Sequence, residues 1–197
     1  LFHEYKSNET LRKLKKKRLV IPCFDTSIDL SQSIEDMEKV LFLFHTAAQM
    51  KVSYIAFCAL RDQEKTVRKN MDTILALAQK HEVCVLLKTV GIYAGTNRLR
   101  ALMDDYACDE LAALWDLHHP YRDFSEMPDT TIRNLGGYVK HVHLRDSDDD
   151  CSYNLIGEGT LPIREMMNAL SSIDYNGFIS LEWKPELITD IPDRDII

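Results

Sequence analysis

Three side chains with metal-binding chemistry occur at the ends of short apolar runs in the sequence. Asp116 and Glu182 each come directly after such a run, and His143 lies near the end of another. A carboxylate, an imidazole and a second carboxylate can share one divalent cation, and these donors suit Mn²⁺, Zn²⁺, Co²⁺ or Mg²⁺. Each residue alone also has a structural explanation, since an aspartate often caps a helix. Their shared position relative to the runs makes the three together a candidate metal site.

Six apolar runs supply the elements that must position these side chains. They cover residues 19–24, 54–59, 83–87, 113–115, 139–144 and 178–181. Most are rich in Val, Ile, Phe and Tyr, and all are too short for ordinary helices. Near-continuous apolar character is typical of parallel strands that are covered on both faces. Functional side chains of parallel α/β folds cluster at the carboxyl ends of the strands, which is where the candidate ligands occur.

Helical periodicity fills the gaps between the runs. Apolar residues recur at three- and four-residue spacing over 34–48, 67–78, 99–106 and 163–170, and Ser31 or Ser33 is expected to cap the first of these helices. A basic segment precedes the first run, and we expect its lysines and arginines to form the solvated face of a helix. Alternating strands and helices predict βα units with a parallel sheet, in a single domain over residues 1–197.

Composition excludes several classes of protein. The chain has 197 residues with 24 basic and 31 acidic side chains, and a net charge of −7 argues against a nucleic-acid partner held through phosphates. No apolar run approaches the ~18 residues of a membrane span, and there is no signal-peptide pattern. The 5 cysteines form no C-x-x-C pair, which favours a reducing cytoplasm. The acidic run at 146–150 lacks the pattern of a calcium loop and is expected to be solvated.

Four motifs follow one another in an order that resembles a known superfamily. They are WDLHHP at 115–120, HVHLRD at 141–146, IGEGTLP at 156–162 and GFISLEW at 177–183, the last ending in Trp183. Together they resemble the xylose isomerase-like TIM barrels, which include sugar isomerases and epimerases and AP endonucleases. The resemblance covers nearly the whole chain. It implies an α/β fold of the TIM (β/α)₈-barrel type and a sugar or sugar-phosphate isomerase or epimerase.

The resemblance also implies roles for individual residues. Sugar isomerases and epimerases of this superfamily hold a divalent metal with Glu, Asp, His and Glu, of which the last three match Asp116, His143 and Glu182. Two glutamates, one of them matching Glu182, move a proton on a carbon next to a carbonyl while the metal polarises the sugar oxygens. His119 matches a substrate-contacting histidine. Arg145 matches a basic residue near the substrate oxygens or phosphate.

The sequence departs from the family pattern at the first ligand. Residues 86–91 read LLKTVG where the family reads LLETHG, so Lys88 takes the place of a glutamate. A protonated lysine has no lone pair for a metal and brings a positive charge into the site. Three hypotheses follow: a metal site with three protein ligands and water, a metal-free site in which Lys88 acts as base or polarises the carbonyl, and a catalytically degenerate sugar-binding relative.

The length of the chain bears on the expected barrel. A complete (β/α)₈ barrel usually needs ~250 residues, and the six runs correspond to strands three to eight of the family. Residues 1–4 then resemble the tail of the second strand. We therefore expect an N-terminally truncated barrel of about six strands plus the tail of a seventh. A homo-oligomer could cover its open edge.

An AP endonuclease-like phosphodiesterase is the less favoured alternative. That branch needs a cluster of zinc ions with additional His and Asp ligands. Residues 151–154 lack the Asp-x-His pair expected there. The expected partner is therefore a small-molecule sugar or sugar phosphate, with no nucleic acid and no membrane.

Overall fold

The computed structural model of the chain describes residues 7–182. The expected strand tail at residues 1–4 and the final motif residue Trp183 lie outside this range. Contacts divide the chain into two compact units, one made of Leu1–Leu87 and Tyr106–Ala112 and the other of Lys88–Asp105 and Ala113–Ile197. The expectation of one domain over residues 1–197 stays a prediction.

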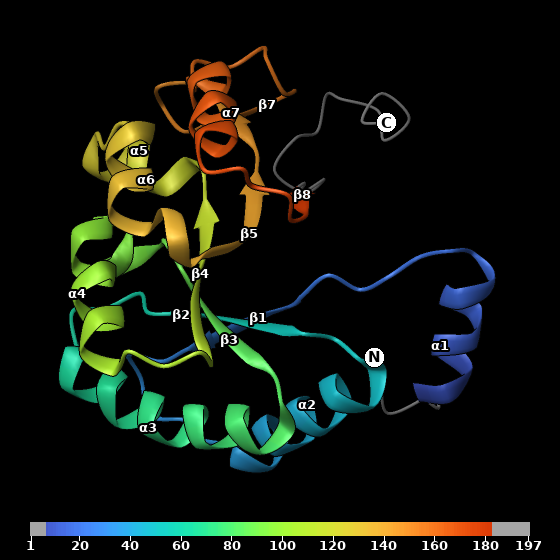
Figure 1. The fold of residues 1–197 in the computed structure, drawn as a ribbon. Coiled ribbons are helices and arrows are strands. Elements are labelled where there is room, and N and C mark those ends of the chain that lie inside the picture. The colour runs from blue at the N-terminus through green and yellow to red at the C-terminus, as the bar shows by residue number, and fades with distance from the viewer. Residues whose placement is uncertain (1–6, 183–197) are drawn as a thin grey trace. The chain divides into compact units, whose positions relative to one another are not determined.

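The first unit is a parallel arrangement of strands with helices. Its elements are α1 (Ser7–Lys16), β1 (Phe24–Asp29), α2 (Met37–Met50), β2 (Tyr54–Cys58), α3 (Glu64–His81) and β3 (Cys84–Lys88), whose last residue belongs to the other unit. Strand β2 pairs in parallel with both β1 and β3. Helices α2 and α3 lie along one side of these strands (Figure 1). Phe44, Phe57 and Ile74 are fully buried in its core, as expected for strands covered by helices.

The start of the first unit differs from the sequence-based prediction. Within the run 19–24, only Phe24 belongs to a strand, and Leu19 and Val20 are 55% and 65% exposed. Pro22 lies within the run and has no N–H for a ladder, which disfavours a strand there. The predicted serine caps of α2 are also wrong, because the Asp36 side chain accepts a hydrogen bond from the Lys39 N–H and caps the helix.

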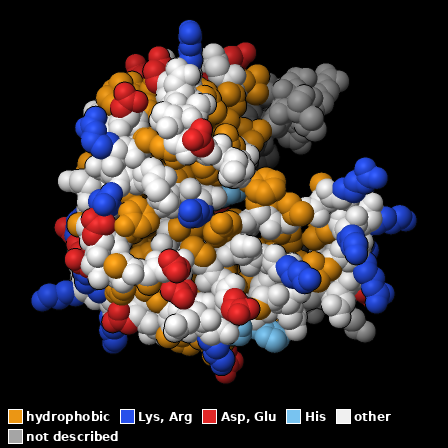
Figure 2. Space-filling model, viewed as in Figure 1, with side chains coloured by type: hydrophobic (Ala, Val, Ile, Leu, Met, Phe, Trp, Pro, Cys, Tyr) orange, Lys and Arg blue, Asp and Glu red, His pale blue; other side chains and the backbone are white. Residues whose placement is uncertain are grey.

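The basic segment lies where the sequence predicted it. Helix α1 carries Lys13, Lys15 and Lys16 in its last turn, and these side chains are exposed while Leu11 and Leu14 are half-buried. Figure 2 shows lysine and arginine side chains gathered over this helix. The solvated helix face is therefore confirmed as far as Lys16, and the exposed Lys17 and Arg18 follow in a turn.

The second unit carries the candidate ligands. It contains most of β4 (Leu111–Asp116), all of β5 (Val139–Leu144) and β8 (Ile179–Leu181), and β5 pairs in parallel with both of the others. The remaining elements are η1 (Gly91–Tyr93), α4 (Thr96–Tyr106), α5 (His118–Phe124), α6 (Pro128–Leu135), η2 (Gly136–Tyr138), the antiparallel pair β6 (Asp146–Ser147) and β7 (Tyr153–Asn154), and α7 (Ile163–Ser172). Helices α6 and α7 lie side by side (Figure 1).

The strand register explains how distant residues meet in this unit. Asp116 is the register partner of His143. The pairing of β5 with β8 continues past the last strand residue, where the N–H of Glu182 donates to the carbonyl of Leu144 at 2.8 Å. Three residues far apart in the sequence therefore lie at the carboxyl ends of adjacent strands.

The parallel strands and intervening helices confirm the predicted α/β class. The strand predictions agree with β2, β3, β4, β5 and β8 to within about two residues, the usual uncertainty of element boundaries. The sequence-based prediction did not include α5 and α6. In the described part of the chain, no helix combines the length and apolar character that crossing a bilayer requires.

Candidate functional site

The predicted metal ligands converge in the second unit. One ligand atom from each of Asp116, His143 and Glu182 lies within 4.8 Å of the other two. Asp116 and His143 are buried, while Glu182 is half-buried. A carboxylate, an imidazole and a second carboxylate therefore face a common point at the carboxyl ends of β4, β5 and β8.

The backbone around Asp116 fixes its carboxylate. Its N–H donates to Oγ1 of Thr89 at 2.9 Å, and that hydroxyl donates to the Asp116 carbonyl at 3.2 Å. Oδ1 accepts from the N–H groups of His118 and His119 at 3.0 and 3.4 Å. Asp116 therefore stabilises the start of α5, as an N-terminal carboxylate does, while its second oxygen remains for another partner.

His143 has a supporting neighbour on the same strand. The ring of His141 packs edge-on against that of His143, with centroids 5.4 Å apart. The Nε2 of His141 lies 2.9 Å from the Ser180 hydroxyl on β8. The contact between β5 and β8 therefore holds the imidazole of His143 in a packed environment.

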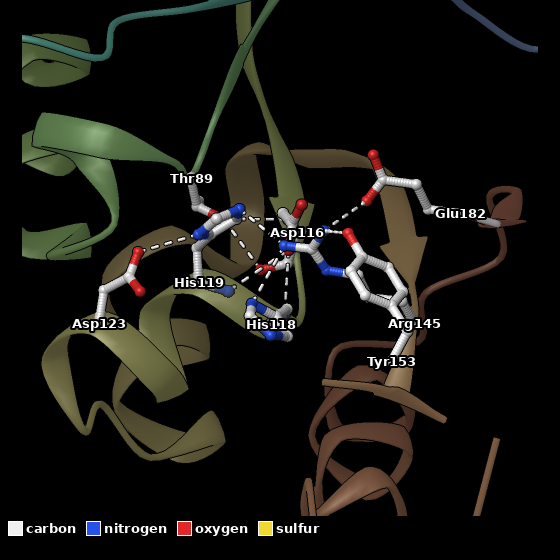
Figure 3. Close-up of polar contacts among 8 residues, drawn as sticks. All are labelled: Thr89, Asp116, His118, His119, Asp123, Arg145, Tyr153 and Glu182. Carbon is white, nitrogen blue, oxygen red and sulfur yellow. Dashed lines mark hydrogen bonds and ion pairs between the residues drawn. The ribbon is translucent and has the colours of Figure 1, made fainter. Parts of the chain in front are cut away.

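Arg145 lies at the centre of the polar contacts in Figure 3. Its Nη1 donates to the Tyr153 hydroxyl and lies 3.3 Å from Oε2 of Glu182. Its Nη2 lies 3.0 Å from Nδ1 of His118 and 2.7 Å from Nε2 of His119. The guanidinium carbon also lies 5.2 Å from the centre of the Tyr153 ring. One buried cation thus joins residues of α5, β7 and the end of β8.

These contacts indicate which ring nitrogen of each histidine accepts a hydrogen bond. Arginine has no acceptor atom, so the facing nitrogens, Nδ1 of His118 and Nε2 of His119, accept its hydrogen bonds. The proton of His119 is then on Nδ1, which lies 2.9 Å from Oδ2 of Asp123. Burial, and then the charge of Arg145, lowers the pKa of His118 to about 4. The His118 imidazole is therefore neutral at neutral pH.

Lys88 lies directly before Thr89, the residue whose hydroxyl bonds to the backbone of Asp116. Lys88 is the last residue of β3, and its side chain is half-buried. The three converging ligands are Asp116, His143 and Glu182. The site therefore gathers all the predicted ligands, with His119 and Arg145 beside them.

The segment from Asp146 to Leu161, here called the support loop, lies directly after β5 and Arg145. The Asp146 carboxylate accepts hydrogen bonds from the N–H groups of Ser147, Gly157, Gly159 and Leu161. A side chain at Gly159 would collide with that carboxylate, which explains the glycine. The expected solvated acidic loop is therefore wrong at Asp146, which is 1% exposed.

Sequence reasoning missed two residues of the site. His118 was part of a quoted motif, but nothing in its spacing distinguished it from the adjacent His119. Tyr153 comes from β7, a two-residue strand too short to leave a periodic signal. The available signal was a helix that starts after Asp116 and is capped by its carboxylate. Such a helix start would have indicated that both histidines lie near the strand ends.

The donor set fits a divalent metal in type but provides three ligands. Asp, His and Glu suit Zn²⁺ and Mn²⁺, and three protein ligands with water are an ordinary catalytic arrangement. The Arg145 cation at Glu182 is the feature that opposes such an ion. The residues therefore fit the metal, with a competing charge beside one ligand.

Comparisons with known proteins place this geometry in a family. Hydroxypyruvate isomerase of Escherichia coli (strain K12) is 21% identical over 132 residues, a match covering 64% of this chain and 50% of that protein. The chain thus spans about half the length of this curated relative.

Solved structures share the fold at low identity. The apo form of the 3-keto-D-glucoside 4-epimerase YcjR from E. coli has a TM-score of 0.78 at 14% identity, over 96% of this chain and 81% of its own. The IOLI protein with a bound zinc atom has a TM-score of 0.79 at 13% identity, over 98% and 77%. At such identities the likeness shows the fold alone.

The family model described as xylose isomerase-like TIM barrel matches residues 2–195. That range includes both compact units and every residue of the candidate site. The parallel strands, the ligands at their carboxyl ends and this match agree: the chain belongs to the family of xylose isomerase-like TIM barrels.

Proposed function

We propose that this chain is a sugar or sugar-phosphate isomerase or epimerase that moves a proton on a carbon next to a carbonyl. The observation that carries the proposal is the convergence of Asp116, His143 and Glu182 within 4.8 Å at adjacent strand ends. Membership of the family, and relatives that act on hydroxypyruvate and a keto-glucoside, support it.

Asp116, His143 and Glu182 would hold the divalent ion, with Mn²⁺, Zn²⁺, Co²⁺ and Mg²⁺ as candidates. When bound, the ion polarises oxygen atoms next to the reacting carbon. As the more exposed of the two carboxylates, Glu182 would take the proton from that carbon and deliver it to the neighbouring carbon in an isomerisation. An epimerisation would need a second group to supply a proton on the opposite face. We assign His119 and Arg145 to contacting the substrate oxygens or a phosphate, with Arg145 supplying the positive charge.

Lys88 supplies the remaining charge of the proposed site. We assign Lys88 to polarising the substrate carbonyl rather than to acting as a base, because a lysine ammonium donates hydrogen bonds and has no acceptor atom. Its position at the end of β3, directly before the Thr89 that holds Asp116, supports this role.

The cellular setting follows from the same proposal. The expected substrate is a small sugar or sugar phosphate handled in carbohydrate metabolism, and the expected location is cytoplasmic. The 5 cysteines, all within the described residues, form no disulfide. A homo-oligomer and the absence of a nucleic-acid partner remain parts of the proposal.

Metal loading with a substrate panel tests the function. The chain would be stripped of metal, reloaded with Mn²⁺ or Co²⁺ and incubated with hydroxypyruvate, ketoses and ketose phosphates. We expect metal-dependent isomerisation or epimerisation in the wild type and a loss of at least ~100-fold in Glu182→Gln. Turnover that is equal with and without metal, or equal in Glu182→Gln, would contradict the proposal.

A catalytically degenerate sugar-binding relative is the second candidate. Two observations favour it: Lys88 replaces a family glutamate, and Arg145 pairs with Glu182. Lys88→Glu discriminates between the two, because a variant that gains metal binding and turnover absent from the wild type supports this candidate. An AP endonuclease-like phosphodiesterase would need further ligands, and within residues 7–182 the converging group has three.

A further inference from the structure

The guanidinium of Arg145 and the carboxylate of Glu182 form a shielded ion pair inside the candidate site. Nη1 lies 3.3 Å from Oε2, and the two side chains are 7% and 24% exposed. Charges so far from water interact more strongly than surface pairs do. Glu182 is at the same time one of the three converging ligands. A single carboxylate therefore faces a fixed internal cation and the place of a divalent one.

The remaining contacts hold Arg145 in this position. Its two terminal nitrogens contact Tyr153, His118 and His119 besides Glu182. None of those three partners is a carboxylate, so Glu182 is the carboxylate that pairs with the guanidinium among the described residues. The neutral groups orient the cation, and Glu182 balances its charge.

We propose that Arg145 is a built-in competitor of the divalent ion for Glu182 and sets a low metal affinity. The inference rests on the metal site of the proposed function and goes beyond it in assigning a residue that opposes loading. Without metal, the positive charge of Arg145 offsets part of the repulsion between Asp116 and Glu182. A divalent ion brings two further positive charges next to the guanidinium, and like charges at short range repel in a poorly solvated site.

The opposite role makes the opposite prediction. If Arg145 merely oriented Glu182 for the metal, removing it would weaken binding, as the loss of an outer hydrogen-bonding partner of a ligand does. A competing cation predicts that neutralising it strengthens binding. The sign of the change in affinity therefore separates the two roles.

Titration of purified protein with Mn²⁺, followed by calorimetry, measures that sign. We expect Arg145→Gln to bind Mn²⁺ at least about tenfold more tightly than the wild type. Arg145→Lys keeps the charge and is expected to remain close to the wild type. Arg100→Gln is the matched control, because Arg100 pairs with Asp104 on the exposed face of α4 and should leave the affinity unchanged.

Three outcomes would overturn the proposal. The first is that Arg145→Gln binds Mn²⁺ no more tightly than the wild type. The second is that Arg145→Lys binds Mn²⁺ as tightly as Arg145→Gln. The third is that neither the wild type nor Arg145→Gln binds Mn²⁺. A crystal structure of the wild type with Mn²⁺ keeps the test valid if Arg145→Gln fails to fold. The Nη1 to Oε2 distance should then exceed 4 Å, the limit of the ion pair, and an intact pair beside a bound ion would refute competition.

Neither the Mn²⁺ titrations nor the Mn²⁺-bound crystal structure needs a substrate. Failure of sugar turnover in a chain whose Arg145→Gln variant binds Mn²⁺ more tightly would remove the proposed function and leave the competition standing. Sugar turnover by a chain whose Arg145→Gln variant has the Mn²⁺ affinity of the wild type would support the proposed function and remove the competition.

Discussion

Two neighbouring regions of the second unit each contain a buried guanidinium, but only one of them has the features of a binding site. Arg122 in the support-loop region and Arg145 in the candidate site have side chains that are each 7% exposed. Arg122 donates to the hydroxyl and carbonyl of Ser147, to Thr160 and to Asp149. All of those acceptors belong to the support loop, so this arginine holds one segment of chain in place.

The candidate site leaves polar atoms without such partners. Among the described residues, Nε of Arg145 and Nε2 of His118 in the candidate site are buried with no hydrogen-bond partner, and so is Nδ2 of Asn154 in the support loop. An orphaned buried donor costs about 1–3 kcal/mol, so native structures rarely keep one without a reason. The two arginines therefore differ: every nitrogen of the Arg122 guanidinium has an acceptor in the support loop, whereas Nε of Arg145 has none.

The largest expected effect lies in the support loop. Asp146→Ala would leave several buried N–H groups without an acceptor, and we expect the free energy of unfolding to fall by about 3 kcal/mol. Urea denaturation measures the loss. Asp150→Ala is the control, because Asp150 is exposed and accepts from the N–H and the hydroxyl of Ser152. Similar losses in both variants would remove the distinction between the loop and an ordinary acidic surface.

The two arginines give the next prediction. Arg122→Gln should lower the free energy of unfolding by about 2 kcal/mol, since it removes several hydrogen bonds and one ion pair. Its Mn²⁺ affinity should stay within about twofold of the wild type, in contrast to the tightening expected for Arg145→Gln. A tightening in Arg122→Gln would show that affinity responds to any nearby positive charge.

A smaller effect is expected at the acceptor side of the candidate site. Tyr153→Phe removes the hydroxyl that accepts from Arg145 but keeps the ring beneath the guanidinium. The cation–π contact should persist, so the loss of stability should be about 1 kcal/mol by thermal denaturation. A loss as large as that of Asp146→Ala would mean that the site is as rigidly built as the loop.

The smallest effect concerns acid stability. Hydrogen bonds from Thr160 and then from Arg122 lower the pKa of Asp149 below its ordinary value of 3.8. The folded state therefore binds fewer protons than the unfolded state near that pH, and this stabilisation is lost as the pH falls through the lowered pKa. Asp149→Asn should make the unfolding midpoint slightly less sensitive to pH between about 5 and 3. An unchanged pH profile would show that Asp149 does not contribute to the acid sensitivity of the support loop.

Much of this fold could be predicted from local sequence. The runs that became β2 and β3 are short, apolar and largely buried, so composition and length alone identified them. The run before Phe24 was misleading because Leu19 and Val20 are apolar yet exposed. Whether an apolar residue is covered depends on tertiary neighbours, which local composition does not contain.

The candidate site was predictable to the extent that it depends on strand ends. Asp116, His143 and Glu182 converge because parallel register places strand ends together. The ion pair between Arg145 and Glu182 depends on rotamers and on the path of the chain after β8, which no spacing encodes. The burial of Asp146 likewise depends on the return of Gly157 and Gly159 to it.

Calorimetric titration of the wild type and of His143→Gln with Mn²⁺ tests the central claim most directly. The claim is that the three converging side chains form one divalent-metal site. We expect saturable binding of one ion per chain in the wild type and loss of that binding in His143→Gln, with both proteins folded by circular dichroism. Failure of the wild type to bind, or binding of equal affinity by His143→Gln, would contradict it.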